Sequence, residues 1–305
     1  MRIDRGLESV RPDARPSAVA LGIFDGVHLG HRAILGTAVT LARAGGLEAV
    51  ACTFDPHPTE ILHPDKAPRA ITTLDERLAL IAEVGIDAVV VLAFSRKLAA
   101  IEPETFVKDV VLERLRAREV VVGYNHRFGR GARGDARLLE DLAGRGGFRA
   151  HVVPPMTVDG AAVSSTEIRA TLQRGDVATA ARHLGRPYSI SGPVTSGAGR
   201  GRTLGFPTAN IEPTRPLLVA RGVYRGLVEV DGRPYPAVVN VGVRPTFGET
   251  TVAVEAHLLD FSGDLYGRRV RLDFLERLRE EMRFPSVDDL KAQVMRDIAS
   301  ARARS

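Results

Sequence analysis

The first half of the chain alternates short apolar runs with stretches that have a helical pattern, and this alternation restricts the fold more than any other feature of the sequence. Strand-length apolar runs lie at 18–24, 48–54, 88–94 and 119–122. Helical patterns lie between them at 32–44, 74–84 and 103–116, and the second of these opens on the capping box of Thr73 and Glu76. Strands that alternate with helices and read as unbroken apolar runs form a parallel sheet covered on both faces. We therefore predict an α/β domain with a doubly wound parallel sheet.

The pattern changes after about Gly185, where glycines, turns and short β-rich runs replace the helices. Strand-length runs lie at 222–230, 233–241, 252–260 and 269–275. The first two are joined by Asp231-Gly232, a two-residue hairpin signal, and a helical pattern follows at 286–301. Short strands without intervening helices predict a small antiparallel β-barrel with a terminal helix. A chain of 305 residues is long enough for two domains, which we place at 1–186 and 187–305.

The single cysteine, Cys52, lies in an apolar run and cannot form an internal disulfide. A buried, inert thiol at that position is consistent with a reducing cytoplasm. The N-terminal segment is charged and has no apolar core, so it does not have the form of a signal peptide. No apolar run approaches the roughly 20 residues that span a bilayer. We therefore expect a cytoplasmic protein without a membrane partner.

The net charge of +5 raises the question of a nucleic-acid partner. Only four of the 42 basic residues are lysine, and the basic residues are dispersed among acidic ones instead of forming a tract. Several arginines lie beside glycine-rich loops, where bound phosphates would explain their presence. We therefore expect small phosphorylated substrates and no nucleic acid.

A ten-residue string, Gly22-Ile23-Phe24-Asp25-Gly26-Val27-His28-Leu29-Gly30-His31, lies where the first predicted strand turns into the first helix. A helix N-terminus presents free N–H groups and the positive end of a dipole, which suits a triphosphate. Gly26 and Gly30 would let the backbone approach such a ligand closely. His28 and His31 could donate to the α-phosphate while pyrophosphate leaves.

The two histidines also have other interpretations. A zinc pair would need the glutamate of an H-E-x-x-H motif or a nearby set of cysteines and histidines, and the sequence has neither. The histidines could instead cap the helix, and the glycines could only shape the turn. An isolated H-x-x-H would favour these structural interpretations, whereas the whole string, placed between a strand and a helix, favours a phosphate site.

The string resembles the nucleotidyltransferase superfamily, and its Phe-Asp-Gly-Val-His form resembles the N-terminal domain of prokaryotic bifunctional riboflavin kinase/FAD synthetases. The similarity continues, in the family's order, through residues 53–58, 123–129 and 163–169. The resemblance implies direct transfer of AMP from ATP to FMN, with no residue covalently modified. It places ATP and its phosphates at Gly22, Phe24, Asp25, Gly26, His28, Gly30, His31, Ser164, Ser165, Thr166 and Arg169.

Some of these segments have simpler interpretations as well. Residues 164–167 fit a capping box, although their hydroxyls, the helix N–H groups and Arg169 could converge on an anion. His126 stands where the family often has phenylalanine, and His57 and His63 read as turn or surface residues. The resemblance places the flavin and the nucleotide near Asn125, Arg127 and Phe128.

A second candidate site lies in the barrel half, where the glycine-rich residues 192–202 lead into 203–211. The glycine-rich part is by itself a weak signal. The Thr208 hydroxyl and the Asn210 carbonyl, two residues apart, can point the same way from extended backbone. Both are hard oxygen ligands of the kind that Mg²⁺ accepts alongside nucleotide phosphates. The alternative interpretation is a turn followed by a capped strand.

This segment resembles riboflavin kinases through its Gly-Phe-Pro-Thr-Ala-Asn sequence, and the similarity continues in order at 222–224, 240–242, 245–247 and 254–261. The resemblance implies that MgATP phosphorylates riboflavin to FMN, and that Glu255 orients the riboflavin 5′-hydroxyl and accepts its proton. Otherwise Glu255 would be a paired surface carboxylate. Arg283 stands where kinases usually have lysine. The resemblance places ATP and phosphates at Gly199, Arg200, Gly201, Arg202, Thr208 and Asn210, Mg²⁺ at Thr208 and Asn210, and flavin at Arg279 and Glu280, with Phe284 in the same motif.

We therefore predict a bifunctional enzyme of FAD synthesis that uses ATP and Mg²⁺, yields FMN and FAD, and exists as a monomer or a weak homo-oligomer. A tRNA-linked adenylating enzyme would share the strand–H-x-x-H–helix site, but residues 164–169 contain no lysine where such enzymes have a lysine-rich signature. A barrel that binds RNA could be tested by filter binding at physiological salt. A flavin-storage module with decayed catalytic residues would not be expected to keep His28, His31, Thr208, Asn210 and Glu255.

Overall fold

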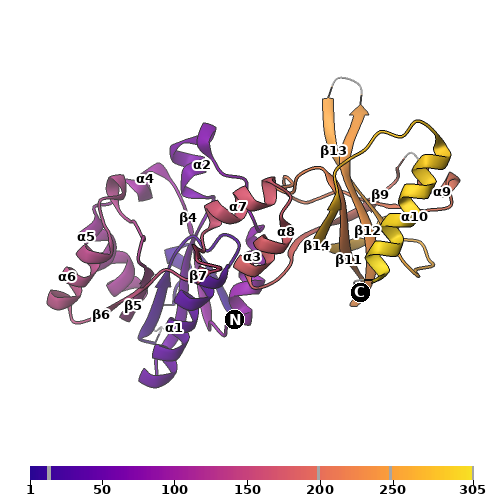
Figure 1. Cartoon of the computed structure of the whole chain (residues 1–305). Coiled ribbons are helices and arrows are strands. Elements are labelled where there is room, and N and C mark those ends of the chain that lie inside the picture. The colour runs from indigo at the N-terminus through magenta and orange to yellow at the C-terminus, as the bar shows by residue number, and fades with distance from the viewer. Residues whose placement is uncertain (12–14, 198–199, 247–248, 304–305) are drawn as a thin grey trace. The chain divides into compact units, whose positions relative to one another are not determined.

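The computed structural model describes residues 1–11, 15–197, 200–246 and 249–303. The chain divides into two compact units, Met1–Ser165 and Thr166–Ser305 (Figure 1). Gly199, predicted to contact phosphate, and Phe247 of the kinase-like motif lie outside the described residues. Within the described ranges, no helix is both long and apolar enough to cross a membrane.

The first unit contains a six-stranded sheet with the order β1-β4-β3-β2-β5-β6, in which every neighbouring pair is parallel. Consecutive strands extend from β2 through β3 and β4 in one direction, and the chain then crosses to β5 on the other side of β2. The doubly wound parallel sheet predicted from the sequence is confirmed. The strands are β1 (Arg2–Arg5), β2 (Ser17–Leu21), β3 (Glu48–Asp55), β4 (Ala88–Ala93), β5 (Ala117–Gly123) and β6 (Arg149–Val153).

Helices connect these strands, and the predicted helix at 103–116 is a short α-helix that continues as the π-helical segment Phe106–Arg114. A small hairpin, β7 (Thr157–Val158) and β8 (Ala161–Ala162), follows the last strand of the sheet. The α-helices are α1 (Leu29–Gly45), α2 (Pro58–Leu62), α3 (Leu74–Glu83), α4 (Arg96–Ala99), α5 (Pro103–Thr105) and α6 (Ala136–Gly146).

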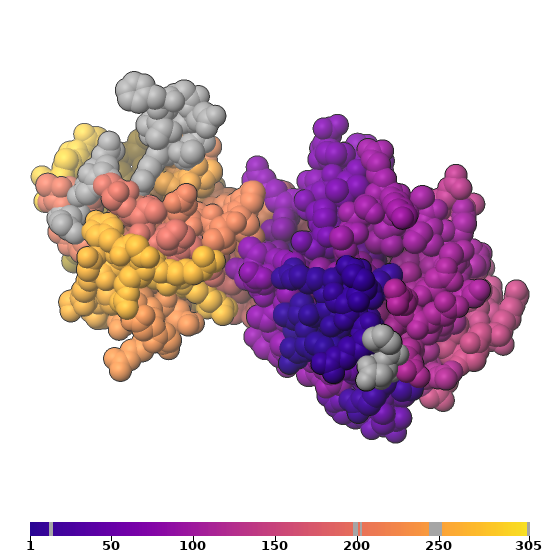
Figure 2. Space-filling view, turned by 180° about the vertical axis from the view of Figure 1, so that it is seen from behind, coloured from indigo at the N-terminus to yellow at the C-terminus, as the bar shows by residue number. Residues whose placement is uncertain are grey.

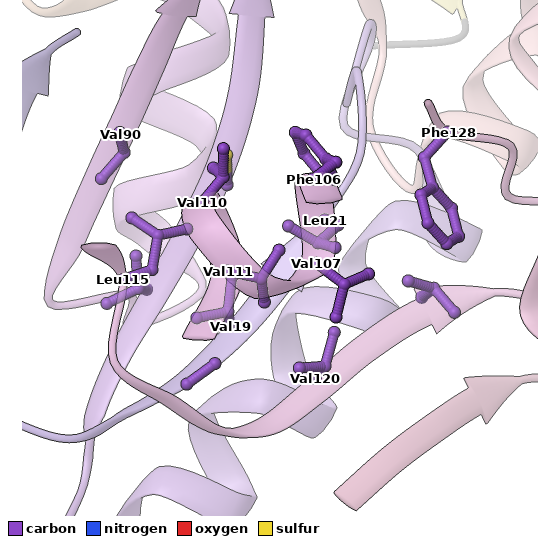
Figure 3. Close-up of a cluster of buried hydrophobic side chains, with 14 of the residues drawn as sticks. Val19, Leu21, Val90, Phe106, Val107, Val110, Val111, Leu115, Val120 and Phe128 are labelled. Carbon is purple, nitrogen blue, oxygen red and sulfur yellow. The ribbon is translucent and has the colours of Figure 1, made fainter. Parts of the chain in front are cut away.

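The sheet is buried on both faces, as the unbroken apolar runs of its central strands require. Along β2, Val19 and Leu21 belong to one hydrophobic cluster, which includes Phe106 (Figure 3). Ala18 and Ala20 belong to the other cluster, together with Leu35 of α1 and Ile81 of α3. Because neighbouring residues of a strand point to opposite faces, these two clusters lie on opposite sides of the sheet.

The two edge strands, β1 and β6, are absent from the sequence prediction. β1 reads Arg-Ile-Asp-Arg and β6 begins at Arg149, so neither has an apolar run. An edge strand pairs on one side only and tolerates charged residues, and the N-terminal residues (indigo in Figure 2) lie at the surface of this unit. Buried Glu119 of β5 accepts hydrogen bonds from Arg149 and His151, which lower the pKa of its carboxyl group.

The second unit contains a closed barrel with the order β10-β13-β12-β11-β14-β9, in which all neighbouring strands are antiparallel. The antiparallel barrel predicted from the sequence is confirmed, and β9 and β10 are additional to the predicted strands. The strands are β9 (Tyr188–Thr195), β10 (Ala209–Ile211), β11 (Gly222–Val230), β12 (Arg233–Thr246), β13 (Glu249–Leu258) and β14 (Arg269–Arg279).

The predicted terminal helix is α10 (Val287–Ala303), and it packs against one side of the barrel. Ala301 and partly buried Ile298 of this helix contact a cluster that contains Val223 of β11 and Val238 of β12. Arg279 at the end of β14 donates to the Asp297 carboxylate at 2.8 Å, which ties the helix to the strand. The short helix α9 (Arg200–Thr203) precedes β10.

Two further helices, α7 (Ser165–Gln173) and α8 (Val177–Leu184), group with the barrel. The Leu172 carbonyl at the end of α7 accepts a hydrogen bond from the Ala220 N–H, and α8 packs on β9 and β14. The compact units therefore divide near Ser165, whereas the sequence pattern changes near residue 186. A functional boundary at 186 stays a prediction.

Candidate active sites

The first candidate site lies at the switch point of the parallel sheet, between β2 and β5. In sheets of this kind, ligands bind outside the carboxyl ends of the strands where the strand order reverses. The loop after β2 contains the string that begins at Gly22, and the loop after β5 contains residues 124–128. Both loops therefore leave the sheet at the edge where a ligand is expected.

His28 is the N-cap residue of α1 and is almost fully buried. Its Nδ1 accepts a hydrogen bond from the His31 N–H at 3.3 Å. Because Nδ1 acts as the acceptor, the proton of the neutral imidazole is on Nε2, which can donate to an anion. The helix-capping interpretation is therefore correct for His28.

The structure brings His28 and His31 together as a stacked pair, with ring centroids 3.6 Å apart and an interplanar angle of 17°. Fully buried Phe24 meets the His31 ring edge-on at 5.4 Å. Two glycines make this arrangement possible. A Cβ on Gly30 would lie 3.2 Å from the His28 ring, and one on Gly22 would lie 2.8 Å from the Phe24 ring.

The Asp25 carboxylate fixes the turn that precedes His28. Asp25 is 3% exposed and accepts hydrogen bonds from the N–H groups of Ile71 and Thr72 at 3.0 and 3.1 Å. The Thr72 hydroxyl donates to Asp25 at 3.2 Å and accepts from the Gly26 N–H at 3.1 Å. Gly26 has a φ of +83°, which residues other than glycine rarely adopt. The segment just before α3 therefore stabilises the conformation of the predicted phosphate loop.

Arg77 of α3 supports the same loop and is not among the residues predicted from the sequence. Its guanidinium donates to the carbonyls of Ile23 at 3.2 Å and Phe54 at 3.0 Å, so it joins the chain just after β2 to the end of β3. Arg77 is 4% exposed, and burial lowers the pKa of its guanidinium while the Asp25 charge opposes that change. The sequence feature that could have identified Arg77 is its place four residues before Ile81, on the apolar face of α3.

The Ser-Ser-Thr segment is divided between the two units. Ser165 lies against the phosphate loop, where its hydroxyl donates to the Asp25 carbonyl at 3.0 Å. Ser164 precedes it, after Val163, whose N–H donates to the Met156 carbonyl. Thr166 and Arg169 lie on α7 in the second unit.

The loop after β5 contains the residues predicted to contact flavin. Asn125 and Arg127 are exposed, and Arg127 pairs with Asp135 at 3.3 Å. Phe128 is 8% exposed and packs against Phe106 of the core, with ring centroids 6.1 Å apart. His126 stacks on Phe128 at 5.8 Å, and burial lowers the pKa of His126 to about 4. The imidazole at this position is therefore neutral at physiological pH.

Replacement of His126 by phenylalanine is expected to reduce the acid sensitivity of the first unit. The folded pKa of about 4 lies below the ordinary value of 6.5, so between these values the unfolded chain binds a proton that the folded chain does not. Stability is thus lost as the pH falls through this window, by on the order of 2 kcal/mol at pH 5. His126→Phe should show a smaller drop in Tm between pH 7 and pH 5 than the unmodified protein. His63→Phe, at an exposed histidine, is the control, and an unchanged pH dependence in His126→Phe would contradict the expectation.

The second candidate site follows from the register of the barrel strands. Asn210 of β10 lies opposite Glu255 of β13, and Glu255 lies opposite Asn240 of β12. Directly opposed residues share a face, with Cβ atoms roughly 5 Å apart. Val254 and Ala256 are buried inside the barrel, so Glu255 lies on the outer face, between two carboxamides.

The Asn210 carbonyl oxygen is buried and has no hydrogen-bond partner among the residues that the structure describes. The glycine-rich backbone passes directly over it, because a Cβ on Gly197 would overlap the Asn210 carboxamide. A Cβ on Gly201 would lie 3.1 Å from the Thr208 hydroxyl oxygen. An unsatisfied buried oxygen beside a hydroxyl, under a glycine cradle, fits the hard oxygen ligands of a bound cation.

The remaining predicted residues of this half lie further along the barrel. Arg279 of β14 lies opposite Val223 of β11, and Val223 lies opposite Asn240 of β12. Arg279 therefore belongs to the same row of paired residues across the strands as Asn240 and Glu255. Exposed Glu280 lies 3.8 Å from Arg277. The Gly201 backbone belongs to α9, while the side chains of Arg200 and Arg202 lie outside what the structure describes.

Comparisons with known proteins agree over both halves of the chain. One family model, described as FAD synthetase, matches residues 10–167, and another, described as riboflavin kinase, matches residues 184–305. A bifunctional riboflavin kinase/FMN adenylyltransferase of Escherichia coli K12 is 39% identical over 306 residues, which cover 99% of this chain and 97% of that protein. A protein of the same description from Bacillus subtilis strain 168 is 35% identical over 294 residues, which cover 94% and 92%.

A solved structure from Streptococcus pneumoniae, described as a macrolide-efflux protein, has a TM-score of 0.91 and 31% sequence identity. The match covers 99% of this chain and 99% of that one. Both units of the present chain therefore have counterparts, in the same order, in a single solved chain.

Proposed function

The chain belongs to the family of bifunctional riboflavin kinase/FMN adenylyltransferases, and on this premise we propose how its residues divide the two reactions. The C-terminal half phosphorylates riboflavin to FMN, and the N-terminal half transfers the adenylyl group of ATP to FMN, which gives FAD and pyrophosphate. The resemblance indicated by the two sets of motifs is thereby confirmed. The residue assignments that follow are proposals.

In the kinase site, Thr208 and Asn210 bind Mg²⁺ through their side-chain oxygens, next to the phosphates of ATP. When bound, the ion would neutralise the charge on the transferred phosphoryl group. Glu255 orients the riboflavin 5′-hydroxyl and accepts its proton. The glycine-rich segment covers the phosphates with Gly199, Arg200, Gly201 and Arg202, and the flavin ring lies towards Arg279 and Glu280.

One observation supports this assignment above all others: the buried Asn210 oxygen that lacks a hydrogen-bond partner among the described residues lies beside Glu255. A buried carbonyl oxygen without a donor is costly unless a ligand satisfies it. A metal–phosphate group at this oxygen would satisfy it. The same position would bring the γ-phosphate next to the carboxylate that takes the proton of the acceptor hydroxyl.

In the adenylyltransferase site, the phosphates of ATP bind at the N-terminus of α1 and at Ser164 and Ser165, and the roles of Thr166 and Arg169 stay predictions from the resemblance. His28 donates from Nε2 to the charge that develops at the α-phosphate, and His31 assists it. Gly26 and Gly30 let the backbone approach the ligand. Positioning and charge stabilisation suffice for direct attack by the FMN phosphate. FMN is bound through Asn125, Arg127 and Phe128.

Three further members of the predicted string act on the site through their contacts within the loop. Gly22 gives space to the Phe24 ring, Phe24 supports the His31 ring, and the Asp25 carboxylate fixes the Gly26 turn. These three residues shape the surface that receives ATP. Arg77 supports it from behind through the Ile23 carbonyl.

Replacement of Asn210 by alanine is expected to raise the Mg²⁺ concentration for half-maximal FMN formation by at least about tenfold, because one metal ligand is lost. The full chain would be incubated with riboflavin, ATP and increasing MgCl₂, and FMN and FAD would be separated over time. FAD formation from added FMN provides the internal control and should keep its wild-type rate. An unchanged Mg²⁺ dependence of the kinase step would contradict the assignment.

We further propose that the protein is cytoplasmic, that its partners are riboflavin, FMN and ATP, and that it is a monomer or a weak homo-oligomer without nucleic-acid or membrane partners. Cys52 supports a reducing compartment: it is fully buried, and burial raises the pKa of its thiol to about 12. The dispersed basic residues support small phosphorylated ligands.

A further inference from the structure

His257 follows Glu255 by two residues on β13 and therefore lies on the same face of the strand. Its Nδ1 lies 2.8 Å from the Pro207 carbonyl oxygen, and its ring meets the Phe206 ring edge-on at 5.9 Å and 87°. A carbonyl oxygen only accepts hydrogen bonds, so Nδ1 must be the donor. His257 thus contacts both residues that come directly before Thr208.

The β-ladder does not reach this part of the chain. The pairing of β10 with β13 begins where Ala209 lies opposite Ala256. One position earlier, Thr208 would lie opposite His257, but the register ends before it, and Pro207 has no N–H to donate. The His257 side chain therefore makes its contact just before β10 begins, where the ladder provides none.

This contact lies directly before Thr208, where no ladder pairing fixes the chain. Asn210 is held by the ladder on both sides, opposite Glu255 on one strand and Thr195 on the other. Thr208 lacks such pairing, and rotation of the Pro207–Thr208 peptide would turn its hydroxyl away from the Gly201 backbone. We propose that His257 is a positioning residue of the kinase site, which fixes this peptide so that Thr208 and Asn210 reach the same Mg²⁺. This inference rests on the proposed role of those two residues as metal ligands.

The test compares His257→Leu with His257→Asn in the full chain. The Asn side-chain nitrogen lies near the position of histidine Nδ1 and can still donate to Pro207, whereas leucine cannot. His257→Leu should raise the Mg²⁺ concentration for half-maximal FMN formation about tenfold, while the KM for riboflavin stays within about twofold. His257→Asn should recover most of the loss. FAD formation from added FMN, and the variant His63→Leu at an exposed histidine of the first unit, are the controls.

Each outcome decides the question. A His257→Leu protein with the wild-type Mg²⁺ dependence would overturn the inference, and so would equal impairment of both His257 variants together with an equal fall in Tm. Asn210→Ala separates this inference from the assignment on which it rests. If Asn210→Ala leaves the Mg²⁺ dependence unchanged, the metal-ligand assignment fails; if only Asn210→Ala changes it, the role of His257 alone fails.

Discussion

Replacement of Glu255 by glutamine is expected to slow FMN formation by about a thousandfold, because an amide cannot accept the proton of the riboflavin 5′-hydroxyl. Glutamine has nearly the same size, so the pairing of β13 with Asn210 and Asn240 should persist. The loss should therefore appear in kcat, with little change in the KM for riboflavin. The measurement is the initial rate of FMN formation at saturating ATP and Mg²⁺, with FAD formation from added FMN as the internal reference.

Glu229→Gln is the matched control for this variant. Glu229 also lies on a barrel strand, is exposed, and is paired with Pro234 and Arg271, away from the row that contains Glu255. Its replacement should leave both reactions at the wild-type rate. If Glu255→Gln kept more than about a tenth of the kinase activity, Glu255 would not be the proton acceptor.

How much of the fold follows from the sequence depends on which faces of a strand are buried. The central strands β2, β3, β4 and β5 read as apolar runs because helices cover both of their faces, and they lie close to their predicted positions. The edge strands β1 and β6 have charged residues and no such pattern. β9 contains serine, glycine and proline, and β10 has only three residues, which is too short for any periodicity.

The candidate sites are predictable as far as they are local. His28, Gly30 and Asp25 belong to one contiguous string, so the motif identifies them together. Arg77 becomes recognisable only when α3 packs on the sheet and brings its guanidinium to two strand ends. The place of Asn240 likewise depends on strand register, which sets it beside Glu255 on the neighbouring strand β13. No short-range pattern contains that information, because it resides in the tertiary pairing.

Replacement of His28 by alanine is expected to slow FAD formation from FMN by about 10²–10³-fold, because a donor aimed at the developing phosphate charge is removed. FMN formation from riboflavin should continue at the wild-type rate, since that reaction belongs to the barrel. The measurement is the time course of FMN and FAD in the presence of riboflavin, ATP and Mg²⁺, in which FMN should accumulate. Alanine also removes the N-cap of α1, which costs about 1 kcal/mol of stability.

A second variant, His28→Asn, separates the cap from the chemistry. Asparagine is a favourable N-cap residue, and its side-chain oxygen can accept from the His31 N–H as His28 Nδ1 does. It lacks the ring that stacks on His31 and the Nε2 donor. His28→Asn should therefore melt at the wild-type temperature and still lose FAD formation. His63→Ala, at an exposed histidine, should keep both the wild-type melting temperature and FAD formation. Wild-type FAD formation by His28→Asn would mean that His28 contributes only the helix cap, and that the charge on the α-phosphate is stabilised by other donors at the start of α1.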